Sequence, residues 1–217
     1  MAPLHLRRSP LPRLSWILLG SLTMLAGPVP GRADSWTLDV AGTANLYGAG
    51  HATPPAPDGH GAGILPPGVA LPTAPERVLR ILSTSGTVKF SPSAPPNGAD
   101  GAVIGTYLMP DWGGLSAYRL YNIARLLSGV FLSDSDPVDP PPAKLLADSL
   151  TFPAMAPALR QIFPIGDGLV GTAAGDTQLF VVPAGATRLF LRIPRFLHPH
   201  GAGLVRGQRR SDHRVLR

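Results

Sequence analysis

The sequence predicts an all-β protein built as a β-sandwich. Three observations lead to this fold class: the apolar runs are short, turn-forming residues separate them at close intervals, and no long amphipathic helix occurs. Glycine and proline number 25 and 26 among 217 residues, and both residues favour turns over helices. Short strands punctuated by turns are typical of sandwiches.

The first 33 residues have the parts of a secretory signal. Three arginines precede residue 14, an apolar segment covers residues 14–29, and Gly31-Arg32-Ala33 supplies small residues at the two positions needed for cleavage. Glycines and prolines interrupt the apolar segment, which falls short of the roughly 20 residues that a membrane span needs. We therefore expect cleavage after Ala33, a secreted or periplasmic/extracellular location, and no membrane span in the mature protein.

Seven runs in the remaining chain are expected to form strands. The first of them alternates in polarity, as a strand with one buried face does. The others are short, apolar and bounded by turn residues. The expected strands are residues 36–46, 77–82, 86–90, 126–132, 162–165, 178–182 and 187–191.

The connections between these strands carry specific expectations. Residues 178–182 and 187–191 are predicted to pair as a hairpin around Pro183-Ala184-Gly185. Residues 116–128 have a short helix as the alternative, but the run at their end is better explained as a strand. Turns are expected in the segment after 86–90, which contains Asn-Gly and Asp-Gly dipeptides.

Residues 48–75 are rich in glycine, proline and alanine. Seven prolines fall between residues 54 and 75, a density that excludes helix and interior strand because proline lacks an amide donor. This segment is either a flexible spacer or a surface loop of the domain.

The charge of the chain is divided unevenly. The net charge is +6, yet residues 34–191 contain eight basic and twelve acidic side chains, a balance of −4. Residues 192–217 contain seven arginines and one acid, Asp212, which gives +6. The chain has no cysteine, so the exported domain folds without disulfides. We therefore expect a sandwich domain at 34–191 followed by a basic, disordered tail at 192–217.

Few residue patterns support catalysis. His51 and His60 do not fit a helical metal-ligand spacing, and the run Gly113 to Ser116 lacks the Gly-x-Ser-x-Gly frame of a nucleophile elbow. The chain is therefore predicted not to be an enzyme.

Acidic residues in two loops leave alternatives open. Asp134, Asp136 and Asp139 stand among prolines, and Asp167 and Asp176 bracket a glycine-rich segment. Such carboxylates can bind calcium or act in glycoside hydrolysis. A solvated loop is the favoured interpretation, with calcium as the better functional one.

The tail also invites a binding interpretation, which we reject. Its histidines and arginines could hold a metal or a phosphate, but apart from Phe196 no aromatic residues are interleaved for base stacking. An unstructured end is favoured, and no nucleic-acid partner is expected. The histidines concerned are His198, His200 and His213.

Several segments in the same order resemble exported bacterial β-sandwich proteins related to the PA-I galactophilic lectins. The resemblance covers most of residues 36–191. It implies a jelly-roll-type, galactose-binding-like sandwich that binds galactose-like glycans through a calcium ion, which accepts several protein oxygens and two sugar hydroxyls. The segments are Leu46 to His51, Gly63 to Val69, Ser85 to Val88, Gly129 to Leu132, Gln161 to Gly168 and Pro183 to Leu191.

The resemblance stops where the family holds most of its calcium ligands. There the family has a Gly-x-x-Asp turn and then a Tyr-x-(Asp/Asn)-Asn-x-Gly turn, whereas this chain has Arg192-Ile193-Pro194-Arg195 and an arginine-rich end. Displacing the reading frame by one nucleotide allows Tyr from Val205, Asp from Gly207 and Asn from Gln208. We therefore hypothesise a frameshifted terminus after about Leu191, with the final strand and the metal site lost. The codons of these three residues test the hypothesis.

Two site residues follow from the resemblance. The main-chain carbonyl of Phe90 matches a calcium ligand of the family, and Asp100 in the following loop is the weaker candidate, as a sugar contact. The expected function is carbohydrate binding, lectin-like and ancestrally calcium-dependent, with no calcium bound by this chain. A non-catalytic structural or protein-interaction sandwich of the cell envelope or extracellular matrix is the alternative.

Overall fold

The chain divides into two compact units, Met1–Arg32 and Ala33–Arg217, and all described residues belong to the second. The predicted signal peptide therefore lies outside the described residues. For residues 107–108 and 214–216 only the backbone is described. The computed structural model describes residues 34–42, 44–55, 64–89, 93–103, 107–108, 110–171, 174–193 and 214–216.

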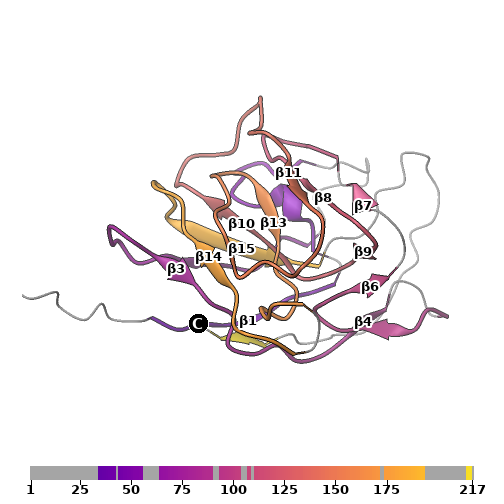
Figure 1. The fold of residues 1–217 in the computed structure, drawn as a ribbon. Coiled ribbons are helices and arrows are strands. Elements are labelled where there is room, and N and C mark those ends of the chain that lie inside the picture. Colours follow the sequence, from indigo (N-terminus) through magenta and orange to yellow (C-terminus); the bar gives the residue numbers. More distant parts are fainter. Residues whose placement is uncertain are drawn as a thin grey trace, which may run out of the picture. The chain divides into compact units, whose positions relative to one another are not determined.

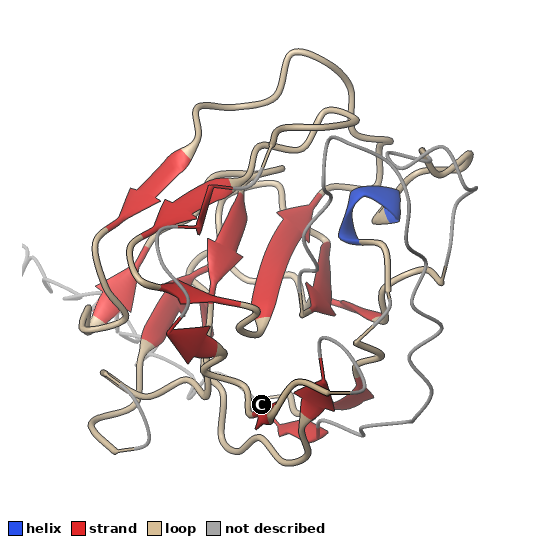
Figure 2. Ribbon diagram, turned by 90° about the vertical axis from the view of Figure 1, so that its right-hand side faces the viewer, coloured by secondary structure: helices blue, strands red, loops and turns tan. Residues whose placement is uncertain are grey.

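The described residues form short strands and one turn of 3-10 helix, and contain no α-helix (Figure 2). The all-β fold is thus confirmed, while a specific jelly-roll order of strands stays a prediction. No helix among these residues has the length and apolar character needed to cross a bilayer. The elements are β1 Thr37–Asp39, η1 Leu46–Gly48, β2 Gly68–Ala70, β3 Val78–Leu79, β4 Val88–Lys89, β5 Pro96–Asn97, β6 Ala102–Val103, β7 Tyr107–Leu108, β8 Tyr118–Leu120, β9 Ile123–Ala124, β10 Ser128–Leu132, β11 Leu145–Ala147, β12 Ala154–Met155, β13 Ile162–Pro164, β14 Leu179–Val181, β15 Arg188–Arg192 and β16 Arg214–Leu216.

The largest sheet has four antiparallel strands in the order β13-β10-β15-β2, of which Figure 1 labels β13, β10 and β15. Its register is fixed along β10, where Val130 lies opposite Ile162 on one side and Phe190 on the other. All five residues of β10 are buried. A strand covered on both faces is expected to be continuously apolar rather than alternating, and the Gly-Val-Phe-Leu run of β10 meets that expectation.

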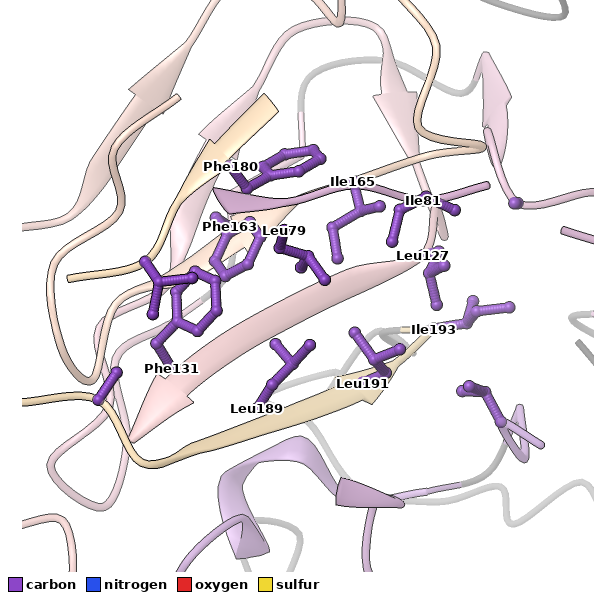
Figure 3. Close-up of a cluster of buried hydrophobic side chains, with 14 of the residues drawn as sticks. Leu79, Ile81, Leu127, Phe131, Phe163, Ile165, Phe180, Leu189, Leu191 and Ile193 are labelled. Atoms are coloured by element: carbon purple, nitrogen blue, oxygen red, sulfur yellow. The ribbon is translucent and has the colours of Figure 1, made fainter. Parts of the chain in front are cut away.

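A second sheet, in the order β12-β14-β3, contributes to the main hydrophobic core. Phe180 of β14 packs on Phe163 of β13 with ring centroids 5.4 Å apart, and Phe163 stacks on Phe131 of β10 at 4.9 Å. Leu189 and Leu191 of β15 line the same core (Figure 3). Aromatic rings at these separations add to the energy gained from burial alone.

The opposite face of the main sheet covers a second core. Val130 and Leu132 of β10 point to this side, where they meet Leu46 and Tyr47 of η1 and Tyr118 of β8. The hydroxyl of Tyr118 is satisfied inside the core by a 2.9 Å hydrogen bond with Ser128, as a buried phenol requires. Residues 116–128 contain β8, β9 and the first residue of β10, so the helix considered for this segment is absent.

The predicted hairpin of 178–182 and 187–191 is wrong. The turn between them exists, with Ala186 N–H donating to the Pro183 carbonyl at 3.2 Å, but β14 and β15 belong to different sheets. Beyond the turn, Val182 N–H bonds to Arg77 and Thr187 N–H bonds to Leu132. Each strand finds a long-range partner, so the chain passes from one sheet to the other.

The strands predicted at 77–82 and 86–90 contain β3 and β4, which lie in different sheets. β3 pairs with β14, and β4 pairs with β5. In the proline-rich stretch, Gly68–Ala70 forms β2, a strand that the proline density alone did not predict. β2 lies at the end of its sheet, where missing amide donors are tolerated. This part of the stretch therefore belongs to the domain surface and is no spacer.

The end of the domain differs by two residues from the predicted boundary at 191. Arg192 completes β15 opposite Ser128, and Ile193 is buried in the main core. In the predicted tail, β16 pairs with β1 through its backbone. Residues 194–213, with the predicted tail histidines His198, His200 and His213, lie outside the described residues, and the frameshift hypothesis stays a prediction.

Candidate functional site

Two loops meet beside the start of β10, and their acidic residues form a pair. The backbone of Leu127 organises the meeting: its N–H donates to the Ala99 carbonyl at 2.7 Å, and its carbonyl accepts from the N–H groups of Ile165 and Gly166 at 2.8 and 3.1 Å. The loop after β5 and the turn after β13 are thereby held on one strand end. This arrangement brings Asp100 next to Asp167, two residues that are 67 positions apart in sequence.

Glycine is required where these loops approach each other. Gly166 has φ +66°, and a Cβ placed on it would lie 2.7 Å from Asp100 Oδ1. Gly101 has φ +76°, and its Cβ would lie 2.2 Å from the Ala124 carbonyl oxygen. A side chain at either position would meet both backbone strain and a collision. The Asp-Gly and Gly-Asp-Gly turns predicted here are thus explained by close packing.

Asp100 and Asp167, which we call the acidic pair, have a defined geometry. Asp100 Oδ1 accepts the N–H of Asp167 at 2.8 Å, and Asp167 Oδ1 accepts the N–H of Leu169 at 2.9 Å. Burial raises the pKa of Asp167 above its ordinary value, and the charge and hydrogen bond of Asp100 raise it further, against the opposing hydrogen bond from Leu169. The structure therefore fastens Asp100, the predicted sugar contact, into a turn.

Glycoside hydrolysis and calcium binding are the two functions that the sequence leaves open for these carboxylates. Among the described residues, no group of three or more histidine and acidic side chains could hold a metal ion, and the predicted ligand Phe90 lies outside them.

The other predicted acidic cluster is built differently. Asp134 accepts from the hydroxyl of Thr187 at 2.7 Å, Asp136 from Ala52 N–H at 2.9 Å, and Asp139 from Gly114 N–H at 3.0 Å. Each carboxylate thus has its own donor on a separate segment. We call residues 133–140 the anchored loop, because these three contacts fasten it to the domain.

Two arginines complete the anchored loop. Arg160 donates to the carbonyls of Val138, Pro140 and Gly114, and Arg188 donates to those of Ser133 and Ser135. A guanidinium group has five donors in a fixed plane and so satisfies several carbonyls at once. These contacts confirm a loop at 134–142 and give its aspartates structural partners.

Other residues considered from the sequence also have structural contacts. The His51 ring and the Gly113 carbonyl are 2.9 Å apart, and Ser116 Oγ bonds to the Ala143 carbonyl at 3.4 Å. Asp176 is exposed, and its backbone carbonyl accepts from Val170 N–H. His60 lies outside the described residues.

A depression lined by residues between Leu146 and Met155 was not predicted from the sequence. Its volume is about 260 Å³, and it opens to solvent between β11 and β12. Its wall combines one carboxylate and two hydroxyl side chains with apolar groups. The lining residues are Leu146, Ala147, Asp148, Ser149, Thr151, Phe152, Ala154 and Met155.

The segment between β11 and β12 is fixed by hydrogen bonds from Gln178. The buried Gln178 side chain donates from Nε2 to the carbonyls of Leu150 at 2.8 Å and Phe152 at 3.0 Å. Leu150 is buried between the lining residues Ser149 and Thr151 in sequence and lies 3.3 Å from where a Cβ on Gly166 would sit, so the segment that lines the depression also contacts the turn that carries Asp167. The sequence signal that could have marked this site is Gln178, a polar residue at the start of the predicted strand 178–182.

The polar groups of the depression are also ordered by local contacts. Ser149 Oγ and Thr151 Oγ1 are 2.5 Å apart, and Thr151 N–H donates to Ser149 Oγ at 3.2 Å. The Phe152 ring is fixed edge-on to Phe180, with centroids 6.0 Å apart. The result is a concave surface with fixed hydroxyls beside an anchored ring.

Comparison of the chain with protein-family models, with curated proteins and with solved structures gives no match.

Proposed function

We propose that this protein is a non-catalytic, exported carbohydrate-binding protein and that the depression between β11 and β12 receives the sugar. The observation that carries the proposal is the composition of the wall. Ser149 and Thr151 hydroxyls and the Asp148 carboxylate can exchange hydrogen bonds with sugar hydroxyls, while the half-buried Phe152 offers an apolar surface to the carbon face of a ring. Ligand sites commonly combine concave shape, apolar walls and a few oriented polar groups.

The ligand class is a single exposed sugar residue of the galactose type. A volume of about 260 Å³ is near the lower end of small-molecule pockets, so it suits one ring better than an extended chain. We propose that binding does not need calcium, since the depression offers one carboxylate and calcium takes 6–8 oxygen ligands. Asp100 then supports the site through Gly166 and Leu150 instead of contacting the sugar.

Glycan-array screening followed by calorimetry tests the proposal. Wild-type protein is expected to retain terminal galactose-type glycans with or without a calcium chelator. Thr151→Val keeps the shape and removes a hydroxyl, and Asp148→Asn removes a charge, so each is expected to weaken binding about tenfold, the effect of one hydrogen bond to a sugar hydroxyl.

Asp176→Asn is the matched control, because Asp176 is an exposed acid outside the depression. Its affinity is expected to equal that of wild type. If no glycan binds, or if the control loses as much affinity as the two depression variants, the proposal is wrong. Loss of binding on addition of the chelator would show that sugar binding needs calcium, contrary to the proposal.

The alternative, a sandwich that serves protein contacts, is favoured by a different observation. Val78 and Leu82 on and after β3 are 50% and 55% exposed, at an edge of the second sheet. An exposed apolar sheet edge of this kind can contact another polypeptide chain.

A further inference from the structure

The side chains of β3 and of the three residues after it alternate between two sides. Leu79 and Ile81 are buried in the main core, whereas Val78, Arg80 and Leu82 are exposed. Val78 lies directly opposite Val181 of β14, which is 44% exposed. The outer face of this edge therefore carries an apolar strip with one arginine in it.

The backbone of β3 also has an open side. The pair Val78 and Val181, together with the 2.9 Å bond from Val182 N–H to the Arg77 carbonyl, directs the backbone groups of Arg77 and Leu79 toward β14. In an antiparallel pair these directions alternate, so the N–H and C=O groups of Val78 point away from β14. β3 is the last strand of its sheet in the described part of the chain (Figure 1). Such an edge is a template for another strand.

The edge is held rigid by its own domain. Arg77 donates to the carbonyls of Pro72 at 3.0 Å, Ala186 at 2.7 Å and Pro183 at 3.4 Å. The strand therefore does not need a partner to be ordered, and little conformational entropy is lost when one arrives.

The side chains on either side of Val78 are complementary to one another. Glu76 and Arg80 are both exposed and stand two residues before and two residues after Val78. Neither is engaged in an ion pair within the described residues. A second strand of the same sequence, running antiparallel with Val78 opposite Val78, places each Glu76 opposite an Arg80.

We propose that two copies of this chain associate through β3 about a two-fold axis at Val78. The two Val78 residues exchange N–H to C=O hydrogen bonds, two Glu76–Arg80 ion pairs flank them, and the two three-stranded sheets join into one. Such an isologous contact uses the same patch on both copies. Moving the axis to Leu79 would pair Arg80 with Val78 and lose both ion pairs. The proposal goes beyond sugar binding and does not depend on it.

Sedimentation equilibrium of the mature protein and of charge variants tests the dimer. Wild type is expected to show a concentration-dependent doubling of mass, weakened by salt because the ion pairs are exposed. Glu76→Arg and Arg80→Glu each place like charges opposite one another and are expected to weaken association at least tenfold. The double variant Glu76→Arg, Arg80→Glu restores opposite charges in both pairs and is expected to regain the dimer.

Val138→Lys is the control, because Val138 is 64% exposed in the anchored loop, away from β3. It is expected to dimerise like wild type, and circular dichroism checks that all variants fold. A wild type that stays monomeric, a double variant that stays as weak as the single ones, or a control that also dissociates would overturn the proposal.

Discussion

The acidic pair and the anchored loop are both aspartate-bearing loops among glycines or prolines, yet they differ in what surrounds each carboxylate. In the acidic pair, Asp100 and Asp167 lie against each other at a half-buried junction. In the anchored loop, Asp134, Asp136 and Asp139 are exposed and bond to three different segments.

The comparison shows that acidic composition alone does not define a site. Burial and the neighbouring Asp100 raise the pKa of Asp167, whereas Asp134, Asp136 and Asp139 each fasten the anchored loop to a different segment. Burial and the position of the hydrogen-bond donors therefore decide what each carboxylate does. The three predictions below test this difference.

The largest expected effect is at the junction of the acidic pair. Gly166→Ala forces a side chain into a positive φ and against Asp100 Oδ1, so we expect the free energy of unfolding to fall by about 3 kcal/mol. Gly98→Ala, in the loop that carries Asp100, has open space around its Cβ and is expected to change stability by less than about 0.5 kcal/mol. Equal effects in chemical denaturation would show that the junction is not closely packed.

A smaller effect is expected in the anchored loop. Arg160→Met keeps the aliphatic stem but leaves the carbonyls of Gly114, Val138 and Pro140 without their donor, which we expect to cost about 2 kcal/mol. Lys89→Met on β4 is the control, since Lys89 is exposed. Thermal unfolding measures both, and a loss confined to the control would contradict the role given to Arg160.

The smallest effect concerns the pH dependence of stability. Because the pKa of Asp167 is raised in the folded protein, mainly by burial, the folded state binds this proton more tightly than the unfolded chain does. The contribution of this bound proton to the free energy of unfolding is therefore fully present below about pH 4, the ordinary range for Asp. It is lost as the pH rises through the pKa that Asp167 has in the folded protein.

Asp167→Asn removes this dependence and keeps an acceptor for Leu169 N–H. The variant is expected to gain about 0.5 kcal/mol over wild type between pH 4 and pH 7, a small value because the group is partly exposed and solvent screens it. Denaturant titrations across this pH range measure the gain. An equal gain in the comparison variant Asp134→Asn, which keeps an acceptor for the Thr187 hydroxyl in the anchored loop, would show that the effect does not come from the burial of Asp167.

The local sequence predicted the strand character of the chain and several turns. The runs at 126–132 and 162–165 contain β10 and β13, and Gly166-Asp167-Gly168 is a turn. These predictions succeeded because apolar runs, glycine and proline act through near neighbours in sequence. Asp100 was singled out from the sequence, but its partner Asp167 was considered only with another loop.

Pairing between distant segments required the tertiary structure. β14 and β15 enter different sheets because Arg77 and Leu132 supply hydrogen bonds to the residues on either side of their turn, and no local pattern carries that information. The depression depends in the same way on Gln178 reaching the carbonyls of Leu150 and Phe152. The sequence by itself determined an all-β chain of short strands with fixed turns. Only the tertiary structure decided which carboxylates share a half-buried junction, because that depends on contacts between residues far apart in the chain.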